Sequence, residues 1–186
     1  EKDVKDCEIW KNQKHYSVEN YQDTRSSLHQ KYIKYLVDKI DFNHSIIDIC
    51  CNQGRHLREL HKRGYRNLIG IDIMFDAIKI LKESKEFSKG GIFAECDLAQ
   101  SFITNSKNAS IDYAITFSAT IELIHPGFDV FKELYRVLNK GFIFIINENG
   151  HTYPRFYRYQ LSSKGFKIRN CEKFSDDLTL LDCIKI

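Results

Sequence analysis

The amino-acid sequence predicts an α/β protein: a single doubly wound, seven-stranded, mostly parallel sheet with an antiparallel C-terminal hairpin and helices on both faces. Apolar, strand-like runs alternate along the chain with segments whose apolar residues recur at helical spacing. The run FIFIINEN, residues 142–149, is so apolar that both of its faces must be covered. Only residues 175–177 separate the last two runs. They are too few for a crossover helix, so they predict an antiparallel pair at one edge of the sheet.

The strand-like runs are bounded by polar or glycine-containing segments, which sets their limits. They lie at residues 45–51, 67–73, 90–97, 111–118, 142–149, 165–174 and 178–186. Helices are predicted between them at about 20–40, 54–63, 75–85 and 125–141. The apolar positions of the first helix are Leu28, Tyr32, Tyr35, Leu36 and Ile40. Gly64 is expected to end the second helix.

The later helices are predicted from their apolar faces. The face of the 125–141 helix consists of Phe128, Phe131, Leu134, Tyr135 and Leu138. Thr152 and Pro154 are expected to open a short helix, whose buried face carries Phe156 and Leu161.

Length and composition favour one globular domain. The chain has 186 residues, enough for a sizeable core, and no linker or repeat divides it. We expect a single domain over residues 1–186, with a polar N-terminal arm at 1–25 and a core at 26–186. A net charge of +3 does not by itself indicate a nucleic-acid partner. No apolar run approaches the ~18 residues of a membrane span and residue 1 opens no signal peptide, so we expect a cytoplasmic protein.

The cysteine pattern indicates buried thiols rather than disulfides or a metal site. Six cysteines occur without a C-x-x-C pair or a zinc-type spacing. Those in or beside apolar, strand-like segments are Cys50, Cys51, Cys96, Cys171 and Cys183. Buried free thiols in a reducing cytoplasm explain this pattern best.

The segment DICCNQG, residues 48–54, is expected to border a ligand site. In doubly wound sheets, ligands bind beyond the carboxyl ends of the strands, where the strand order reverses. A dinucleotide-binding turn would have the pattern G-x-G-x-x-G, but those positions hold Cys50, Asn52 and Arg55. The segment therefore argues against a hydride-transfer enzyme.

The same segment resembles motif I of the class I S-adenosylmethionine-dependent methyltransferases, which have a Rossmann-like fold; the small-molecule type fits best. That motif reads acidic-x-Gly-x-Gly-x-Gly; Asp48 and Gly54 are kept, whereas Cys50 and Asn52 replace the middle glycines. Asparagine tolerates a left-handed backbone, so we expect a positive φ at Asn52. Cys50 is small, so the strand end still passes near the methionine part of a cofactor. The resemblance implies that all four residues border S-adenosyl-L-methionine.

The resemblance continues in register over about residues 25–186. In IGIDI it implies that Asp72 accepts hydrogen bonds from the ribose hydroxyls, with Ile73 or Met74 against the adenine. In AECDLA it implies that Asp97 binds the adenine amino group, unless a register shift of two makes Glu95 the contact.

Further matches complete the cofactor site that the resemblance implies. The backbone of Leu98 would lie at the edge of the adenine ring. In IDYAITFSATIELIHP, Phe117 and Ser118 would lie beneath the methionine chain. Residues 138–141 stand where the family has Leu-Lys-Pro-Gly.

The resemblance implies methyl transfer to an oxygen or nitrogen of a small molecule, with S-adenosyl-L-homocysteine as product. A neutral amine acceptor needs no base, whereas a hydroxyl benefits from one. His125, just past the fourth strand, is the candidate base, and Glu122, one turn earlier, is placed to hold it.

Acceptor recognition is expected from two segments rich in Tyr, Arg and His. The arm supplies Tyr16 and Tyr21, and the insert after the fifth strand supplies Tyr153 and Arg155. Arg25 is a candidate for the cofactor's carboxylate. Such groups suit an acidic, aromatic or hydroxylated small molecule, although they would equally serve to coat helix faces.

Two other functions stay open on the sequence alone. The basic helix RHLRELHKRGYR, with cations near the C-terminus, predicts a track for RNA and hence an RNA methyltransferase. The loss of two motif glycines favours, alternatively, a non-catalytic S-adenosylmethionine-binding protein. The sequence does not reveal the oligomeric state.

Overall fold

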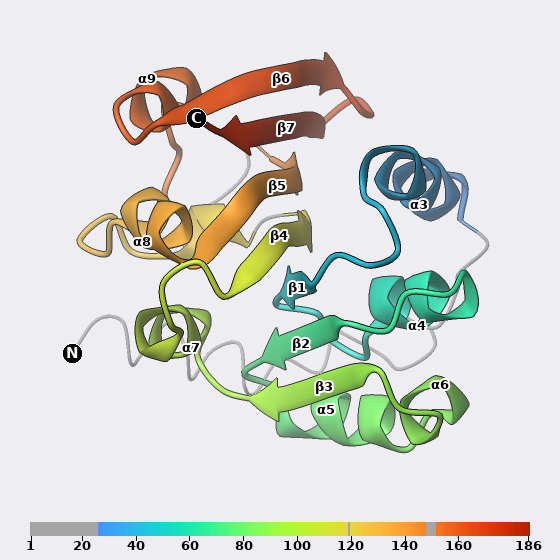
Figure 1. Ribbon diagram of the computed structural model, residues 1–186. Helices are drawn as coiled ribbons and strands as arrows, with labels where there is room; N and C mark the ends of the chain where they lie inside the picture. Colours follow the sequence, from blue (N-terminus) through green and yellow to red (C-terminus); the bar gives the residue numbers. More distant parts are fainter. Residues whose placement is uncertain (1–25, 119, 148–151) are drawn as a thin grey trace.

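The computed structural model describes residues 26–118, 120–147 and 152–186. Its strands form one seven-stranded sheet in the order β3-β2-β1-β4-β5-β7-β6 (Figure 1). They are β1 (Ile46–Ile49), β2 (Leu68–Asp72), β3 (Ile92–Cys96), β4 (Ile111–Phe117), β5 (Leu138–Ile146), β6 (Phe166–Lys173) and β7 (Thr179–Lys185). Strands β1 to β5 pair in parallel, while β7 pairs antiparallel with both β5 and β6. The predicted mostly parallel sheet and its antiparallel hairpin are confirmed.

Helices cover both faces of this sheet, as predicted. They are α3 (Ser27–Lys39), α4 (Arg55–Lys62), α5 (Phe75–Lys82), α6 (Lys85–Ser88), α7 (Ala99–Asn105), α8 (Val130–Val137) and α9 (Tyr157–Ser162), with a 3-10 turn, η1, at Ile121–Leu123. Helices α3, α4 and α5 bury apolar residues in one core cluster, and α7, α8 and α9 contribute to a second. In Figure 1 the two groups lie on opposite sides of the strands.

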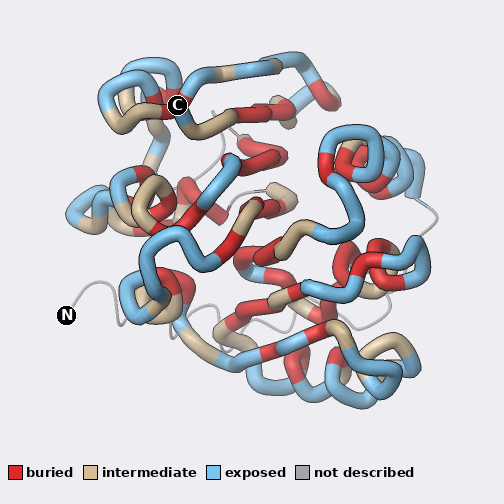
Figure 2. The backbone as a smooth tube through the Cα atoms, viewed as in Figure 1, coloured by how far each residue is buried: buried red, intermediate tan, exposed pale blue. Residues whose placement is uncertain are grey.

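Strand β5 separates the two core clusters. Phe142 and Phe144 pack in the cluster of α7, α8 and α9, while Ile143 and Ile145 pack in the cluster of α3, α4 and α5. Successive side chains of a strand point to opposite faces, so this strand is buried on both of them. Figure 2 shows the buried residues concentrated along the central strands and the inner sides of the helices.

Helix α3 is fixed on the sheet near the carboxyl ends of the strands. The Ser26 hydroxyl accepts a hydrogen bond from the His29 N–H at 3.2 Å and so caps the helix. The hydroxyl of the fully buried Tyr32 donates to the carbonyls of Thr116 and Ile143, at 3.1 and 2.6 Å. These bonds hold α3 against β4 and β5.

Some predicted helix limits were too wide, because capping residues end the helices earlier or begin them later than predicted. Helix α3 begins at Ser27, while residues 20–25 of the predicted helix lie outside the described residues. Helix α5 ends at Lys82, and Ser84 caps the separate helix α6. Helix α8 begins only after Asp129, whose carboxylate accepts from the Lys132 N–H.

The segments around α7, α8 and α9 hold further differences from the prediction. Phe128 precedes α8, and Leu138 already belongs to β5. Helix α7 was not predicted; its buried residues are only Ala99 and Ile103, too few to give a periodic signal. Phe156 was expected to be buried, but it is 85% exposed at the start of α9.

The buried-thiol prediction holds for only part of the cysteines. Cys51 and Cys183 are buried free thiols, whereas Cys50, Cys96 and Cys171 are exposed. Cys50 follows the end of β1, and the other two exposed residues lie on the edge strands β3 and β6, where one side of the strand faces solvent.

None of the helices in the described part of the chain is long and apolar enough to cross a membrane.

Candidate ligand site at the strand ends

The candidate site lies beyond the carboxyl ends of β1, β2, β3 and β4. Strand β1 pairs with β2 on one side and with β4 on the other, so the strand order reverses at β1. Such a reversal leaves a crevice between the turns that follow the two neighbouring strands. The residues predicted from the sequence after β1, β2 and β4 therefore converge on one place.

The turn over residues 50–54 has a left-handed backbone at three positions. Cys50, Asn52 and Gly54 have φ values of 58°, 51° and 67°. The predicted positive φ of Asn52 is confirmed, and that of Cys50 was not foreseen. A Cβ at Gly54 would lie 2.5 Å from the Leu81 side chain, so this glycine also allows α4 to approach α5 closely.

Asp72 holds this turn from the side of β2. Its carboxylate accepts hydrogen bonds from the backbone N–H groups of Asn52, at 2.7 Å, and Met74, at 2.9 Å. Burial raises the pKa of Asp72 above its ordinary value, against the opposing effect of these two hydrogen bonds. Asp72 thus links the turn after β1 to the turn after β2.

Behind the turn, three buried polar side chains meet. Oδ2 of Asp48 lies 3.4 Å from Nδ1 of His56, in the first turn of α4. The ring of His29, on α3, stacks on that of His56 with centroids 5.1 Å apart. His29 and His56 were not predicted as site residues, although the position of His56 directly after the turn was a usable signal.

The turn after β3 carries the residues expected near an adenine. Asp97 is half-buried, and its Oδ1 accepts from the Leu98 N–H at 2.7 Å. The Asp97 N–H donates to the Asp72 carbonyl, so this turn is joined to the end of β2. Glu95 lies within β3 and is exposed, and Ile73 is half-buried beside the site.

Phe117 closes the crevice on the side of β4. Its half-buried ring contacts the rings of Tyr32 and His56, with centroids 5.4 and 5.3 Å away. The guanidinium of Arg55, at the start of α4, lies 5.8 Å from the centre of the Phe117 ring. Ser118 follows with a φ of 64°, which turns the chain sharply at the strand end.

The segment after β4 is tied to the segment after β5 by a set of hydrogen bonds that we call the clasp. Oε1 of the fully buried Glu122 accepts from the Tyr157 hydroxyl at 2.5 Å and from the Asn147 N–H at 3.1 Å. Arg155 donates to the carbonyls of Ile121 and Ile124, at 2.9 and 2.6 Å. The clasp thus holds η1 against the start of α9.

His125 stands beside this clasp. Its Nδ1 accepts from the Gly127 N–H at 3.0 Å, and its half-buried ring meets the Tyr153 ring edge-on at 5.3 Å. A neutral imidazole whose Nδ1 accepts a hydrogen bond carries its proton on Nε2. The predicted Tyr16, Tyr21 and Arg25 lie outside the described residues.

A metal site is absent from the described residues, which hold no group of three or more His, Cys, Asp or Glu placed to bind an ion.

Comparison with known proteins gives a family and a fold. A family model described as "Methyltransferase domain" matches residues 46–141, just over half of the chain. These residues run from β1 into β5 and include the turns after β1, β2, β3 and β4 that border the candidate site. No match was found among curated proteins.

Solved structures share the fold at low sequence identity. The magnesium protoporphyrin IX methyltransferase of Synechocystis PCC 6803, crystallised with S-adenosylmethionine, has a TM-score of 0.72 at 13% identity, covering 97% of both chains. The PH0226 protein of Pyrococcus horikoshii OT3 has a TM-score of 0.71 at 19% identity, over 93% of this chain and 98% of that one. The geranyl diphosphate C-methyltransferase of Streptomyces coelicolor A3(2) has a TM-score of 0.66 at 10% identity, over 85% and 76%.

Proposed function

Since this chain belongs to the methyltransferase domain family, whose members use S-adenosylmethionine, we propose that it methylates an oxygen or nitrogen of a small molecule. The observation that carries this proposal is the turn over residues 50–54. It keeps the left-handed backbone of a glycine-rich cofactor turn at Cys50, Asn52 and Gly54, with the Asp72 carboxylate beside it.

The described residues fit this cofactor. Oδ2 of the buried Asp48 makes no hydrogen bond in the described part of the chain, although Nδ1 of His56 lies 3.4 Å away, so this oxygen retains capacity to accept one from a ligand. Asp72 would hold the ribose hydroxyls, Asp97 and Leu98 the adenine, and Phe117 the methionine chain. Each Asp72 oxygen accepts one backbone hydrogen bond and retains capacity for another.

When bound, S-adenosylmethionine supplies an already activated methyl group, so the protein's task is mainly to align the acceptor. His125 presents Nε2–H when its Nδ1 accepts from Gly127, so it suits donation of a hydrogen bond to the acceptor better than proton removal. Glu122 is fully buried within the clasp, where it positions η1 and α9. This arrangement favours an acceptor that is nucleophilic without a strong base, such as a neutral amine.

We further propose that residues 1–25 form an arm over the site of a single domain spanning residues 1–186. Its Tyr16 or Tyr21 would face the reacting methyl group, and Arg25 would bind the cofactor's carboxylate. Tyr153, whose ring meets His125, would contribute from the opposite side. Arg155 is engaged by two carbonyls in the clasp, which supports a structural role for it rather than acceptor binding.

The cations of the suggested RNA track are largely engaged within the protein. Arg58 pairs with Glu86, Arg63 with Glu59 and Lys164 with Asp129. Arg169 pairs with the buried Asp182, and Arg66 donates to the carbonyls of His61 and Tyr65. A phosphate backbone would have to compete with these partners, so the small-molecule function is favoured.

The free buried thiols of Cys51 and Cys183 support a cytoplasmic setting.

Calorimetry with S-adenosylmethionine and S-adenosylhomocysteine tests the proposal first. Saturable binding of both is expected, and no binding at millimolar cofactor would refute it. Transfer of a labelled methyl group in a cell extract tests the acceptor class. Label in the small-molecule fraction supports the proposal, while label in RNA would favour the RNA alternative. Tight binding with no transfer to any fraction would favour a non-catalytic protein.

A further inference from the structure

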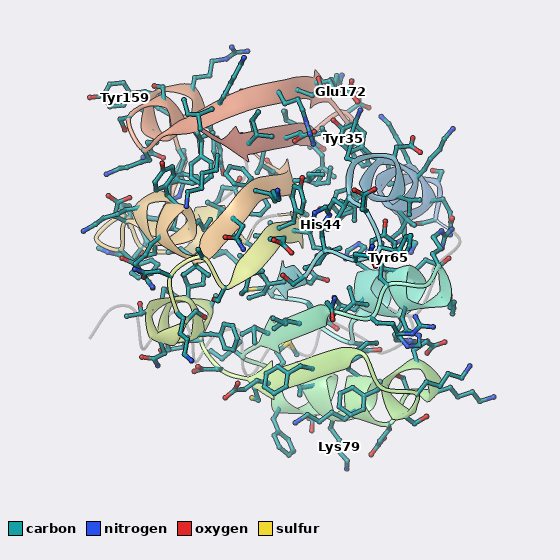
Figure 3. All side chains as sticks on the ribbon, viewed as in Figure 1. Tyr35, His44, Tyr65, Lys79, Tyr159 and Glu172 are labelled. Atoms are coloured by element: carbon teal, nitrogen blue, oxygen red, sulfur yellow. The ribbon has the colours of Figure 1, made fainter. Side chains whose placement is uncertain are left out.

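The outer side of α9 exposes two aromatic side chains to solvent. Phe156, at the start of the helix, is 85% exposed and Tyr159 is 76% exposed, more than any other large hydrophobic side chain among the described residues. Tyr157 and Leu161 are buried in the core cluster of α7, α8 and α9 and anchor the helix. Phe156 and Tyr159 therefore lie on the side away from the core, and Figure 3 shows Tyr159 pointing away from the molecule.

The stretch of chain around α9 is cationic. Residues 149–171 contain five Arg and Lys residues but no Asp or Glu, although the whole chain has 25 acidic residues. Arg155 is engaged in the clasp, and Lys164 pairs with Asp129 of the α8 cap. Arg158 is exposed and has no ion pair or hydrogen bond within the part of the chain that the structure describes. The outer side of α9 thus combines two exposed rings with one unpaired cation.

We propose that Phe156, Arg158 and Tyr159, which we call the α9 surface, dock on the surface of an anionic lipid bilayer. Aromatic rings are favoured at the level of the lipid headgroups, and tyrosine in particular places its ring in the apolar layer and its hydroxyl in water. The guanidinium of Arg158 is attracted by anionic headgroups and suits their phosphate oxygens. Such docking is peripheral and is distinct from a membrane-spanning helix.

The small size of the α9 surface favours a bilayer over a protein partner. A stable protein–protein interface takes about 20–30 residues from each side. The α9 surface consists of three residues at the start of a helix that is only six residues long. A bilayer can take up such a small aromatic tip by partial insertion, with a weak and reversible affinity.

The clasp connects the α9 surface to the candidate site. Arg155, next to Phe156 in the chain, donates to the carbonyls of Ile121 and Ile124. His125 follows directly, and its ring meets that of Tyr153. Docking through α9 would therefore bring the His125 side of the crevice near the lipid surface.

Tryptophan fluorescence with vesicles of an equal mixture of phosphatidylcholine and phosphatidylserine tests the inference. In Phe156→Trp, the new tryptophan is expected to lose fluorescence when the acyl chains of the lipids carry bromine, a quencher that acts only on contact. Phe93→Trp is the matched control, because Phe93 is also exposed but lies on β3, at the opposite edge of the sheet. It should not be quenched. The signal of Trp10, the only native tryptophan, is measured in the wild-type protein and subtracted.

Vesicle sedimentation measures the two contributions separately. Arg158→Gln is expected to weaken binding to these vesicles about fivefold, the usual effect of one cation near an anionic lipid surface. Lys167→Gln is the control with the same change of charge. Its neighbours Phe166 and Ile168 pack on the α9 side of the sheet, so Lys167 lies on the other face and its removal should change little.

The aromatic contribution is tested by replacing both rings. Phe156→Ser combined with Tyr159→Ser should weaken vesicle binding by about tenfold or more, because it removes the apolar area that enters the bilayer. Vesicles of phosphatidylcholine alone should bind the wild-type protein more weakly than the mixed vesicles do. Both substituted residues are exposed, and if the double variant does not fold, the quenching of Phe156→Trp decides.

Three results would overturn the inference. These are no binding to the mixed vesicles, equal binding to phosphatidylcholine alone, or vesicle binding without quenching of Phe156→Trp. Self-association of the wild-type protein that the double serine variant abolishes, measured by analytical ultracentrifugation without lipid, would instead assign the α9 surface to a second copy of the chain. Each of these outcomes leaves the proposed function intact, because cofactor calorimetry tests that function without vesicles.

Discussion

The left-handed residues of the 50–54 turn show how residue type limits prediction. A left-handed backbone costs a residue other than glycine about 1–2 kcal/mol. Asn52 offsets part of this cost because its Oδ1 accepts from the Gln53 N–H at 2.7 Å. This tolerance belongs to asparagine as a type, so the sequence could predict it. Cysteine has no such tolerance, and the φ of Cys50 is imposed by the surrounding structure, which the sequence does not display.

Substitutions at Asn52 test this account of the turn. Asn52→Gly is expected to keep or improve the affinity for S-adenosylhomocysteine, because glycine adopts a φ of 51° without strain. Asn52→Val is expected to weaken binding by about 1–3 kcal/mol, because a β-branched residue resists this conformation. Calorimetry measures both, and equal affinities would mean that the backbone of this turn does not govern binding.

Asp72 is expected to affect cofactor binding through both the ribose and the turn. Asp72→Ala removes the acceptor for the Asn52 and Met74 N–H groups as well as the expected ribose contacts. Affinity for S-adenosylhomocysteine should fall by about 1.5–3 kcal/mol, the range for hydrogen bonds to a charged group. Asp76→Ala, an exposed carboxylate in the first turn of α5, is the control and should leave the affinity unchanged.

Among the elements, the clasp between η1 and α9 contains two residues that the sequence suggested for the site, Glu122 and Arg155. The sequence shows Glu122 and Arg155 as polar side chains near a crevice. It does not show that the carbonyls of η1 need donors, or that β5 ends with a backbone N–H facing a buried carboxylate. Such partners appear only when segments distant in the sequence are placed together.

The bond between Tyr157 and Glu122 is expected to stabilise the fold. Tyr157→Phe should lower the free energy of unfolding by about 1.5–3 kcal/mol, because it removes a donor from a buried carboxylate. Tyr159→Phe is the control from the same helix; its ring is 76% exposed and points away from the protein in Figure 3. Urea unfolding measures both, and equal losses would contradict a stabilising role for the clasp.

Helix α3 makes stability depend on pH through His29. Its pKa is about 3 in the folded protein, because it is buried, and ~6.5 in the unfolded chain. Below pH ~6.5 the unfolded chain therefore binds a proton that the folded protein does not. The contribution of His29 to the free energy of unfolding is fully present above that pH. It is lost as the pH decreases towards about 3, by on the order of 1 kcal/mol per pH unit.

His29→Phe keeps a ring to stack on His56 but cannot titrate. Its free energy of unfolding, measured in urea at pH 7 and pH 5, should depend less on pH than that of the wild type. An unchanged pH dependence in this variant would place the acid sensitivity in other groups.

At the scale of the whole molecule, the alternation of strand-like and helical segments predicted the sheet, because the apolar residues of each segment recur at the spacing of its own type of element. The position of β7 between β5 and β6 was not predicted, although a signal existed. Strand β7 is largely buried, whereas most residues of β6 are exposed or half-buried, as expected of an edge strand. The predicted helix limits were wrong where a single capping residue sets the limit, as Asp129 does at the start of α8.

Deletion of residues 1–19 tests the division of labour between arm and core. This segment has no clear apolar stripe in the sequence, so its removal should leave thermal stability nearly unchanged. Methyl transfer should be abolished, because the arm is expected to supply acceptor contacts. A truncated protein with full turnover would assign acceptor recognition to other segments.

The strand order also has a consequence for synthesis on the ribosome. The outer neighbour of β5 in the sheet is β7. Strand β7 is the last strand of the chain, so the ribosome makes it only after β6. At about 5–20 residues per second, the stretch from Ile146 to Thr179 takes a few seconds to appear. During that interval the nascent chain exposes an unpaired, apolar strand edge at Phe142 to Ile146, a template for association with other chains. The newly made protein should therefore depend on chaperones most in the interval just before its last strand is complete.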